Sequence, residues 1–124
     1  MNILDSSGWL AVVSQSRNAA AFLEIIEAGD LVVPAITLYE VRKRTLQFGS
    51  EAAANQVEQH MRRFPVVDLT ADRASAACGL AIRHKLPMAD SIIYAATLEF
   101  NATLWTQDRD FKGLPKVRWL TATA

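Results

Sequence analysis

The sequence predicts an α/β fold of three layers, with a four- to five-stranded, mostly parallel sheet flanked by helices. Short apolar runs alternate with longer stretches of helical periodicity, which is the pattern of strands connected by helices. The length of 124 residues suits one hydrophobic core, and a hydrophobic content of 51% excludes a disordered chain. Because no linker, repeat or low-complexity stretch divides the chain, residues 1–124 are expected to form a single domain.

The first half is expected to supply two strands and four helices. Residues 2–5 form a short apolar strand, and helices follow at 7–14 and 18–28, the second ending at Gly29. A second strand at 31–33 is closed by Pro34 and leads into a helix over 36–48. Ser50 is the expected N-cap of a helix that runs to about residue 63.

The second half continues the alternation. A third strand is expected at 66–69, and Thr70 caps a helix over 71–85. Asp72 falls in the first turn of this helix, where the helix dipole favours an acid. Pro87 precedes a helix over 88–100 with apolar residues along one stripe. A fourth strand at 103–106 and a fifth, at the sheet edge, over 117–120 complete the domain.

Charge and cysteine content restrict the function. The 13 basic and 13 acidic residues cancel, so overall charge predicts no nucleic-acid partner. The distribution is uneven, because residues 1–40 hold one basic and five acidic groups whereas residues 41–63 hold five and two. This dipole predicts an acidic pocket beside a basic rim, although scattered solvated charges fit equally well. The single cysteine, Cys78, excludes an internal disulfide and is interpreted as part of a packed helix face.

A cytoplasmic protein without a membrane partner is expected. No apolar stretch approaches the roughly 18 residues of a membrane span. The first residues lack the basic start of a secretion signal, since Asp5 follows almost at once.

Four acids stand where apolar segments begin or end: Asp5, Glu40, Asp90 and Asp108. Acidic side chains are rarely buried unless they are paired or bind a metal. Because the strand ends of an α/β domain meet at one edge of the sheet, we expect these acids to gather there. A cluster of carboxylates is a site for Mg²⁺ or Mn²⁺.

Each acid taken alone also has an ordinary structural interpretation. Asp5 can cap the next helix, and Glu40 can pair with Arg44 one helical turn away. Asp90 occupies a first turn, where the dipole favours an acid in any case. Asp108 and Asp110 can form a polar turn. Only the joint pattern favours a metal site.

With their neighbours, the acids resemble a known family. The segments that carry the resemblance are Ile3-Leu4-Asp5-Ser6-Ser7, Thr37-Leu38-Tyr39-Glu40-Val41, Pro87-Met88-Ala89-Asp90-Ser91-Ile92-Ile93-Tyr94-Ala95-Ala96 and Leu104-Trp105-Thr106-Gln107-Asp108-Arg109-Asp110-Phe111. Their order and spacing resemble the PIN-domain nucleases, and among them the small VapC-type toxins of toxin–antitoxin pairs, over about residues 2–120. The resemblance implies a PIN-like (Rossmann-like) sheet and Mg²⁺- or Mn²⁺-dependent cleavage of RNA.

The resemblance also implies roles for individual residues. Carried over by position, the metal-binding and catalytic acids are Asp5, Glu40, Asp90 and Asp108, and Asp110 is an accessory acid. Ser6 matches the hydroxyl that follows the first acid in the family, whereas Ser7 replaces a frequent Asn and its role stays open. The expected substrate-binding residues are Ser6 and the nearby basic residues Arg42, Lys43 and Arg109, with Arg44 and Lys112 beside them.

Two protein partners are expected. The resemblance implies a cognate antitoxin protein. A homodimer is expected because Trp9 and Phe22 give the early helices more apolar surface than one thin domain needs to cover. Core positions for both residues are an equal alternative.

Three other functions stay open. The chain can be a housekeeping RNA-processing PIN nuclease, or a catalytically weak RNA-binding or regulatory PIN domain. It can also be a phosphatase on another α/β fold, with Asp5 as phosphoryl acceptor. The phosphatase is disfavoured because Ser7 stands where such enzymes carry a second acid.

Overall fold

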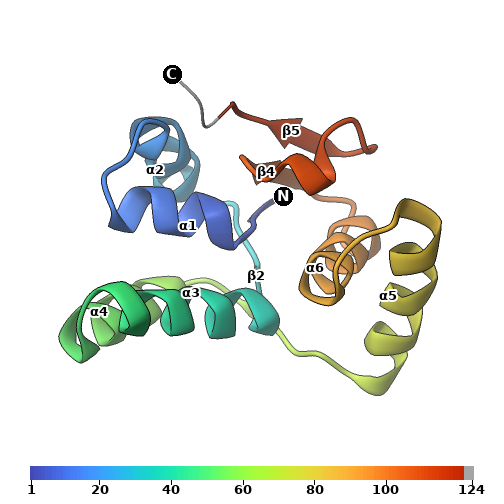
Figure 1. Cartoon of the computed structure of the whole chain (residues 1–124), viewed down its shortest axis with the longest axis horizontal. Helices are drawn as coiled ribbons and strands as arrows, with labels where there is room; N and C mark the ends of the chain where they lie inside the picture. The colour runs from blue at the N-terminus through green and yellow to red at the C-terminus, as the bar shows by residue number, and fades with distance from the viewer. Residues whose placement is uncertain (122–124) are drawn as a thin grey trace.

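The computed structural model describes residues 1–121 as a sheet with helices on both faces (Figure 1). In chain order, the elements are β1 (Asn2–Leu4), α1 (Ser6–Val13), α2 (Ala19–Ala28), β2 (Val33–Pro34), α3 (Ala35–Phe48), α4 (Glu51–Met61), β3 (Val66–Val67), α5 (Ala71–His84), α6 (Met88–Glu99), β4 (Thr103–Thr106), the 3₁₀ helix η1 (Arg109–Phe111) and β5 (Val117–Trp119).

Every strand pair among these elements is parallel. One sheet has the order β1-β4-β5, with Ile3 opposite Leu104, and a second pairs β2 with β3. A parallel bridge between Asn2 and Leu31 connects the two sheets, so the strands run 3-2-1-4-5 across the molecule. This confirms the predicted α/β fold with a mostly parallel sheet. The carboxyl ends of β1 and β4 lie side by side and lead directly to Asp5 and Asp108.

Two apolar clusters cover the two faces of the sheet. Along β1, Ile3 belongs to the cluster under α5 and α6, whereas Leu4 belongs to the cluster under α1 to α4. Leu104 and Trp105 alternate in the same way along β4. This period of two is expected for a strand that is covered on both sides. Figure 1 shows α1 to α4 on one side and the α5–α6 pair on the other.

Close packing of α1 on α2 depends on a glycine. A Cβ atom at Gly8 would come within 3.0 Å of the Phe22 ring and 3.2 Å of Leu4. Residues without a side chain allow such an approach. The tight contact holds the first turn of α1, and with it Asp5, against the end of the sheet.

Some element boundaries differ from the sequence prediction. The strand β3 contains two residues instead of the expected 66–69, and β2 includes Pro34. Helix α1 starts at Ser6 because Asp5 caps it. Among residues 1–121, no helix combines the length and apolar character that crossing a membrane requires.

Three side chains test the sequence analysis directly. The expectation for Cys78 is wrong, because Cys78 is exposed on α5 and does not lie on a packed helix face. Trp9 and Phe22 are 1% and 0% exposed, so the core alternative is confirmed for both and neither gives apolar surface to a dimer. Trp9 packs edge-on against His60 of α4, with the ring centroids 5.9 Å apart.

Candidate metal centre

Three carboxylates meet beyond the end of β4. Oxygen atoms of Asp90, Asp108 and Asp110 lie within 4.8 Å of one another, a spacing that could hold a metal ion. Asp90 stands in the first turn of α6, which Pro87 starts. Asp108 caps η1 by accepting a hydrogen bond from the amide of Asp110 (2.9 Å), so the predicted polar turn is present too. The structure thus gives Asp110 the same place in the triplet as the other two acids.

Asp5 approaches this triplet from β1 and is almost completely buried, with 2% exposure. Its Oδ1 accepts hydrogen bonds from the Ser7 hydroxyl (2.7 Å) and the Gly8 amide (3.2 Å), and its Oδ2 accepts one from the Thr106 hydroxyl (2.8 Å). Asp5 is therefore an N-cap, as one interpretation of the sequence predicted. Its second oxygen faces β4, where Thr106 donates to it.

Thr106 connects Asp5 to Asp108. Its hydroxyl donates to Asp5 and accepts a hydrogen bond from the Asp108 amide (2.9 Å), and its side chain is 0% exposed. Sequence patterns do not single out Thr106, because threonine is an ordinary residue in a strand. Its position two residues before Asp108, at the end of a strand, was the available signal.

Mutual repulsion and burial shift the protonation of these acids. Burial raises the pKa of Asp5 from 3.8 to about 6, against the lowering effect of its three hydrogen bonds, and the charge of Asp108 raises it further. Burial, the charge of Asp108 and a hydrogen bond with Asp110 raise the pKa of Asp90 from 3.8 to about 8. A bound cation would relieve this repulsion.

Glu40 approaches the acids from α3. Burial raises the pKa of its carboxyl group, a hydrogen bond with Ser6 lowers it, the charge of Asp108 raises it and that of Lys43 lowers it. Within the described part of the chain, Oε1 of Glu40 is buried without a hydrogen-bond partner. The alternative pairing with Arg44 does not form there, since Arg44 lies over the Phe48 ring at 4.8 Å.

The donor set fits a hard divalent cation. All candidate ligands are carboxylate oxygens, which Mg²⁺ and Mn²⁺ prefer to nitrogen or sulfur. Buried polar atoms normally have a partner, so the unpartnered Oε1 of Glu40 is consistent with a ligand that protein atoms do not supply.

Comparisons with known proteins identify the family of the chain. A family model described as PIN domain matches residues 3–117. The chain belongs to the PIN-domain family. No curated protein sequence matches it significantly.

Solved structures share the fold of this PIN domain. A toxin–antitoxin complex from Klebsiella pneumoniae superposes with a TM-score of 0.80 at 22% identity, covering 95% of this chain and 96% of that chain. VapC20 from Mycobacterium tuberculosis, described as a Sarcin-Ricin loop cleaving toxin, gives 0.76 at 19% identity, with 95% and 99% covered. VapBC2 from Rickettsia felis, bound to a promoter DNA fragment, gives 0.73 at 16% identity, with 97% of each chain covered.

The predicted basic residues are not equally close to the acids. In this PIN domain, Arg42 is turned to α4, where it donates to Asn55 (2.9 Å) and pairs with Glu58 (3.2 Å). Lys43 is near enough to Glu40 to lower the pKa of its carboxyl group. Arg109 is exposed on η1 between two of the acids. Lys43 and Arg109 therefore border the acids, whereas Arg42 is bonded elsewhere.

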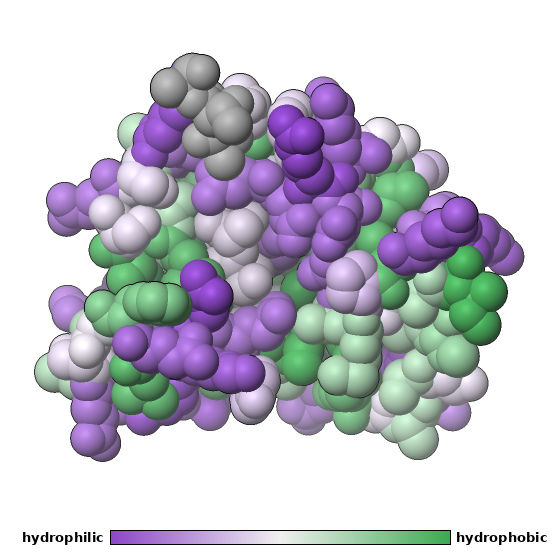
Figure 2. Space-filling model, in the orientation of Figure 1, coloured by the Kyte–Doolittle hydropathy of each residue, from purple (hydrophilic) through white to green (hydrophobic). Residues whose placement is uncertain are grey.

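The surface around the site is polar. Figure 2 shows hydrophilic residues gathered over β4, β5 and their connection, and apolar residues over α5.

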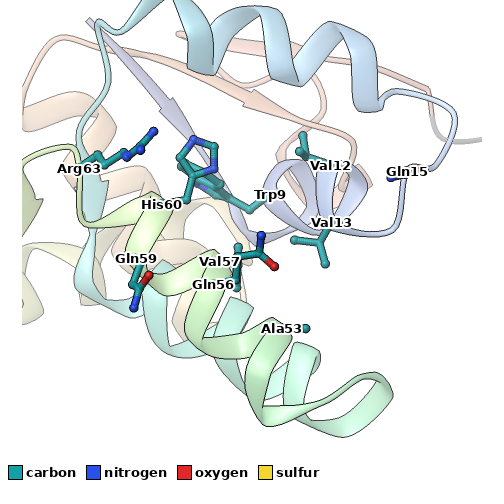
Figure 3. A pocket seen from close by; sticks show the side chains of 10 residues that line it. All are labelled: Trp9, Val12, Val13, Gln15, Ala53, Gln56, Val57, Gln59, His60 and Arg63. Atoms are coloured by element: carbon teal, nitrogen blue, oxygen red, sulfur yellow. The ribbon is translucent and has the colours of Figure 1, made fainter.

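A separate hollow of about 630 Å³ lies between α1 and α4, lined by residues that include Trp9, His60 and Arg63 (Figure 3). No acid lines this hollow, so it is not part of the candidate metal centre.

Proposed function

We propose that this PIN domain is a metal-dependent endoribonuclease, and that it is the toxin of a VapBC-type toxin–antitoxin pair. The observation that carries the proposal is the Asp90–Asp108–Asp110 triplet, whose oxygens lie within 4.8 Å of one another, with Asp5 and Glu40 near enough for the charge of Asp108 to raise the pKa of both. The shared fold of proteins described as VapBC toxins supports it.

Asp90 and Asp108 would hold Mg²⁺ or Mn²⁺, with Asp110 as a third oxygen donor. Asp5 and Glu40 would complete the acidic surroundings, directly or through water. The chemistry supplied by such an ion is the acidification of a coordinated water and the neutralisation of charge on the scissile phosphate.

The chain itself supplies orientation and charge control. Ser7, Gly8 and Thr106 hold both oxygens of Asp5 in fixed directions before any ligand binds. Such preorganisation removes the cost of orienting the carboxylate during the reaction. The raised pKa of Asp90 lets the metal-free site hold a proton near neutral pH, and binding of a cation releases it.

We assign the substrate rim to Lys43, Arg109 and the Ser6 hydroxyl. Contacts to phosphate position an RNA chain without reading its sequence. Specificity then comes from the shape of the RNA or from single-stranded loops. Arg42 contributes less because Glu58 already neutralises its charge.

Two nuclease-related alternatives differ in context. A housekeeping RNA-processing enzyme would have the same site, and an adjacent gene for a small DNA-binding protein with a basic tail favours the toxin. A catalytically weak RNA-binding domain does not need five converging acids.

The phosphatase alternative is disfavoured further, because a nucleophilic Asp5 would have to attack phosphate from a position that is 2% exposed.

We also propose two protein contacts for this cytoplasmic toxin. An Arg or Lys side chain of the antitoxin can enter the acidic pocket and relieve the same repulsion as a metal.

A homodimer would use exposed apolar residues other than Trp9 and Phe22, such as Phe48 of α3 (78% exposed) and Ile82 of α5 (77%). Light scattering after size exclusion tests the dimer, and a monomer mass at about 100 µM protein with full activity would contradict it.

The test of the proposed activity is RNA cleavage with Mg²⁺, with Mn²⁺ and with EDTA. Asp5→Asn, Glu40→Gln, Asp90→Asn and Asp108→Asn each keep side-chain volume and should remove most metal-dependent cleavage while the protein still melts cooperatively. Asp68→Asn and Asp72→Asn are the controls, because both acids are exposed and lie outside the cluster. Wild-type cleavage in any two of the four site variants would reject the assignment.

A further inference from the structure

Gln107, the residue that follows β4, is hydrogen-bonded through its backbone amide and through both ends of its side-chain amide. Its backbone amide donates to the Ser7 hydroxyl (3.2 Å), and its side-chain Nε2 donates to the Ser7 carbonyl (3.3 Å). Its side-chain oxygen accepts a hydrogen bond from Asn18 (2.9 Å). Gln107 therefore holds both the hydroxyl and the carbonyl group of Ser7 from its position just after β4. The Ser7 hydroxyl in turn donates a hydrogen bond to Asp5 (2.7 Å).

Asn18 is used in an unusual way that supports this connection. It occupies the N-cap position of α2, where an asparagine normally bonds an amide of its own helix, but its side chain makes no capping bond. Its Nδ2 donates to the side-chain oxygen of Gln107 (2.9 Å) and to the carbonyl of Thr121 (2.9 Å). Both contacts are with segments far away in sequence, so Asn18 links the start of α2 to the segments that follow β4 and β5.

We propose that Gln107 is a positioning residue for the metal centre. It acts through Ser7 on Asp5, and Asn18 fixes its side chain. The inference rests on the proposed function, because it gives Asp5 a role at the metal. Ser7 lies in the first turn of α1. Among the described hydrogen-bond partners of Ser7, only Gln107 bonds to both its hydroxyl and its carbonyl group, so Gln107 fixes the orientation of Ser7 towards Asp5.

Loss of the Gln107 side chain should loosen Ser7 without removing it. The backbone bond to the Ser7 hydroxyl remains in any variant, so the effect is smaller than that of deleting the hydroxyl. Removal of a group that orients a metal ligand typically weakens metal binding by about 10- to 100-fold, which we expect for Ser7→Ala. For Gln107→Met, which keeps the length but not the polar atoms, we expect about 3- to 10-fold.

The experiment measures Mn²⁺ affinity by electron paramagnetic resonance, beside kcat and KM for RNA cleavage. Gln107→Met should weaken Mn²⁺ binding and lower kcat, with KM for RNA unchanged. Asn18→Ala should act in the same direction, and should add less than about twofold when combined with Gln107→Met, because both changes break one connection.

The matched control is Asn2→Ala. Asn2 accepts a hydrogen bond from the Trp105 indole (2.8 Å), so its side-chain amide also joins two segments far apart in sequence, but it does so from the amino end of β1 and has no bond to Ser7 or Asp5 among the described contacts. It should lower the melting temperature and leave Mn²⁺ affinity unchanged. A merely structural Gln107 would behave as this control does.

The outcomes separate the inference from the proposed function. If Asp5→Asn abolishes Mn²⁺ binding and cleavage but Gln107→Met changes only stability, the inference is overturned and the proposed function stands. If Asp5→Asn changes neither Mn²⁺ binding nor cleavage, the inference fails, and the proposed function fails with it when a second of the four site variants also keeps wild-type cleavage. Should Gln107→Met not fold, Asn18→Ala decides in the same assay: an unchanged Mn²⁺ affinity overturns the inference.

Discussion

Replacing Asp90 by Asn should stabilise the metal-free protein, although it should destroy the metal centre. The unfolded carboxyl group releases its proton near pH 3.8, whereas burial and the neighbouring acids raise the pKa of the folded one to about 8. Between these values the folded state binds more protons than the unfolded state, so wild-type stability falls as pH rises through this window. The Asn variant does not titrate and avoids this loss.

The magnitude follows from the same two pKa values. A tenfold change in proton affinity corresponds to about 1.4 kcal/mol, so a shift from 3.8 to about 8 would be worth roughly 5 to 6 kcal/mol in a fully buried site. Asp90 is only half-buried, and solvent screens the repulsion, so we expect about 2 kcal/mol at pH 8 and above. For a chain of this length, that raises the melting temperature by roughly 8 °C.

The assay is thermal unfolding in EDTA from pH 4 to pH 9, with wild type, Asp90→Asn and the control Asp72→Asn. The gain of Asp90→Asn over wild type should be near zero at pH 4, grow with pH and level off near pH 8. Asp72 is exposed in the first turn of α5, so its variant should show no such gain. An Asp90→Asn protein that is equally or less stable than wild type at pH 8 would refute the crowded, buried acid cluster.

Three further predictions concern the metal, Thr106 and the rim. Mg²⁺ at about 100 times its dissociation constant should stabilise wild type by about 2.7 kcal/mol in thermal melts, and should not stabilise Asp108→Asn; equal stabilisation of both would contradict the site. Thr106→Val leaves Oδ2 of Asp5 and the Asp108 amide without their bonds to the hydroxyl, so chemical unfolding should show a loss of about 1–3 kcal/mol, which Thr106→Ser should largely restore. Lys43→Glu should weaken RNA binding and flatten its dependence on salt in filter-binding titrations. Arg42→Glu should mainly lower stability, because it breaks the pair with Glu58. If Arg42→Glu instead weakened RNA binding more than Lys43→Glu, the substrate-binding residues would lie on the side of α4.

Local sequence patterns were sufficient for the fold. Apolar runs that alternate with helical periodicity predict a covered parallel sheet, and strand ends in such a sheet meet at one edge. Asp5 and Asp108 directly follow the paired strands β1 and β4, so their proximity follows from the topology. Glu40 and Asp90 come from helices, and their place at the site follows only from how α3 and α6 pack on the sheet.

The supporting residues could not be predicted because they act across the fold. The bond between Thr106 and Asp5 joins residues that are 101 positions apart, and no local pattern marks either partner of Gln107. Adjacency in sequence was misleading for Arg42, because neighbouring residues of a helix do not share a face. The sequence left core and surface positions open for Trp9 and Phe22, because the glycine contact that lets α1 and α2 pack closely is tertiary.

The most direct test of the metal centre is anomalous diffraction from crystals grown with Mn²⁺. We predict one peak or a close pair of peaks between Asp90 and Asp108, with carboxylate oxygens at about 2.0–2.3 Å, the range of oxygen ligands to small divalent cations. The same crystals of Asp108→Asn should lose the peak while Asp90 keeps its position. A fully occupied Mn²⁺ peak elsewhere on the domain, with none among these acids, would contradict the metal centre.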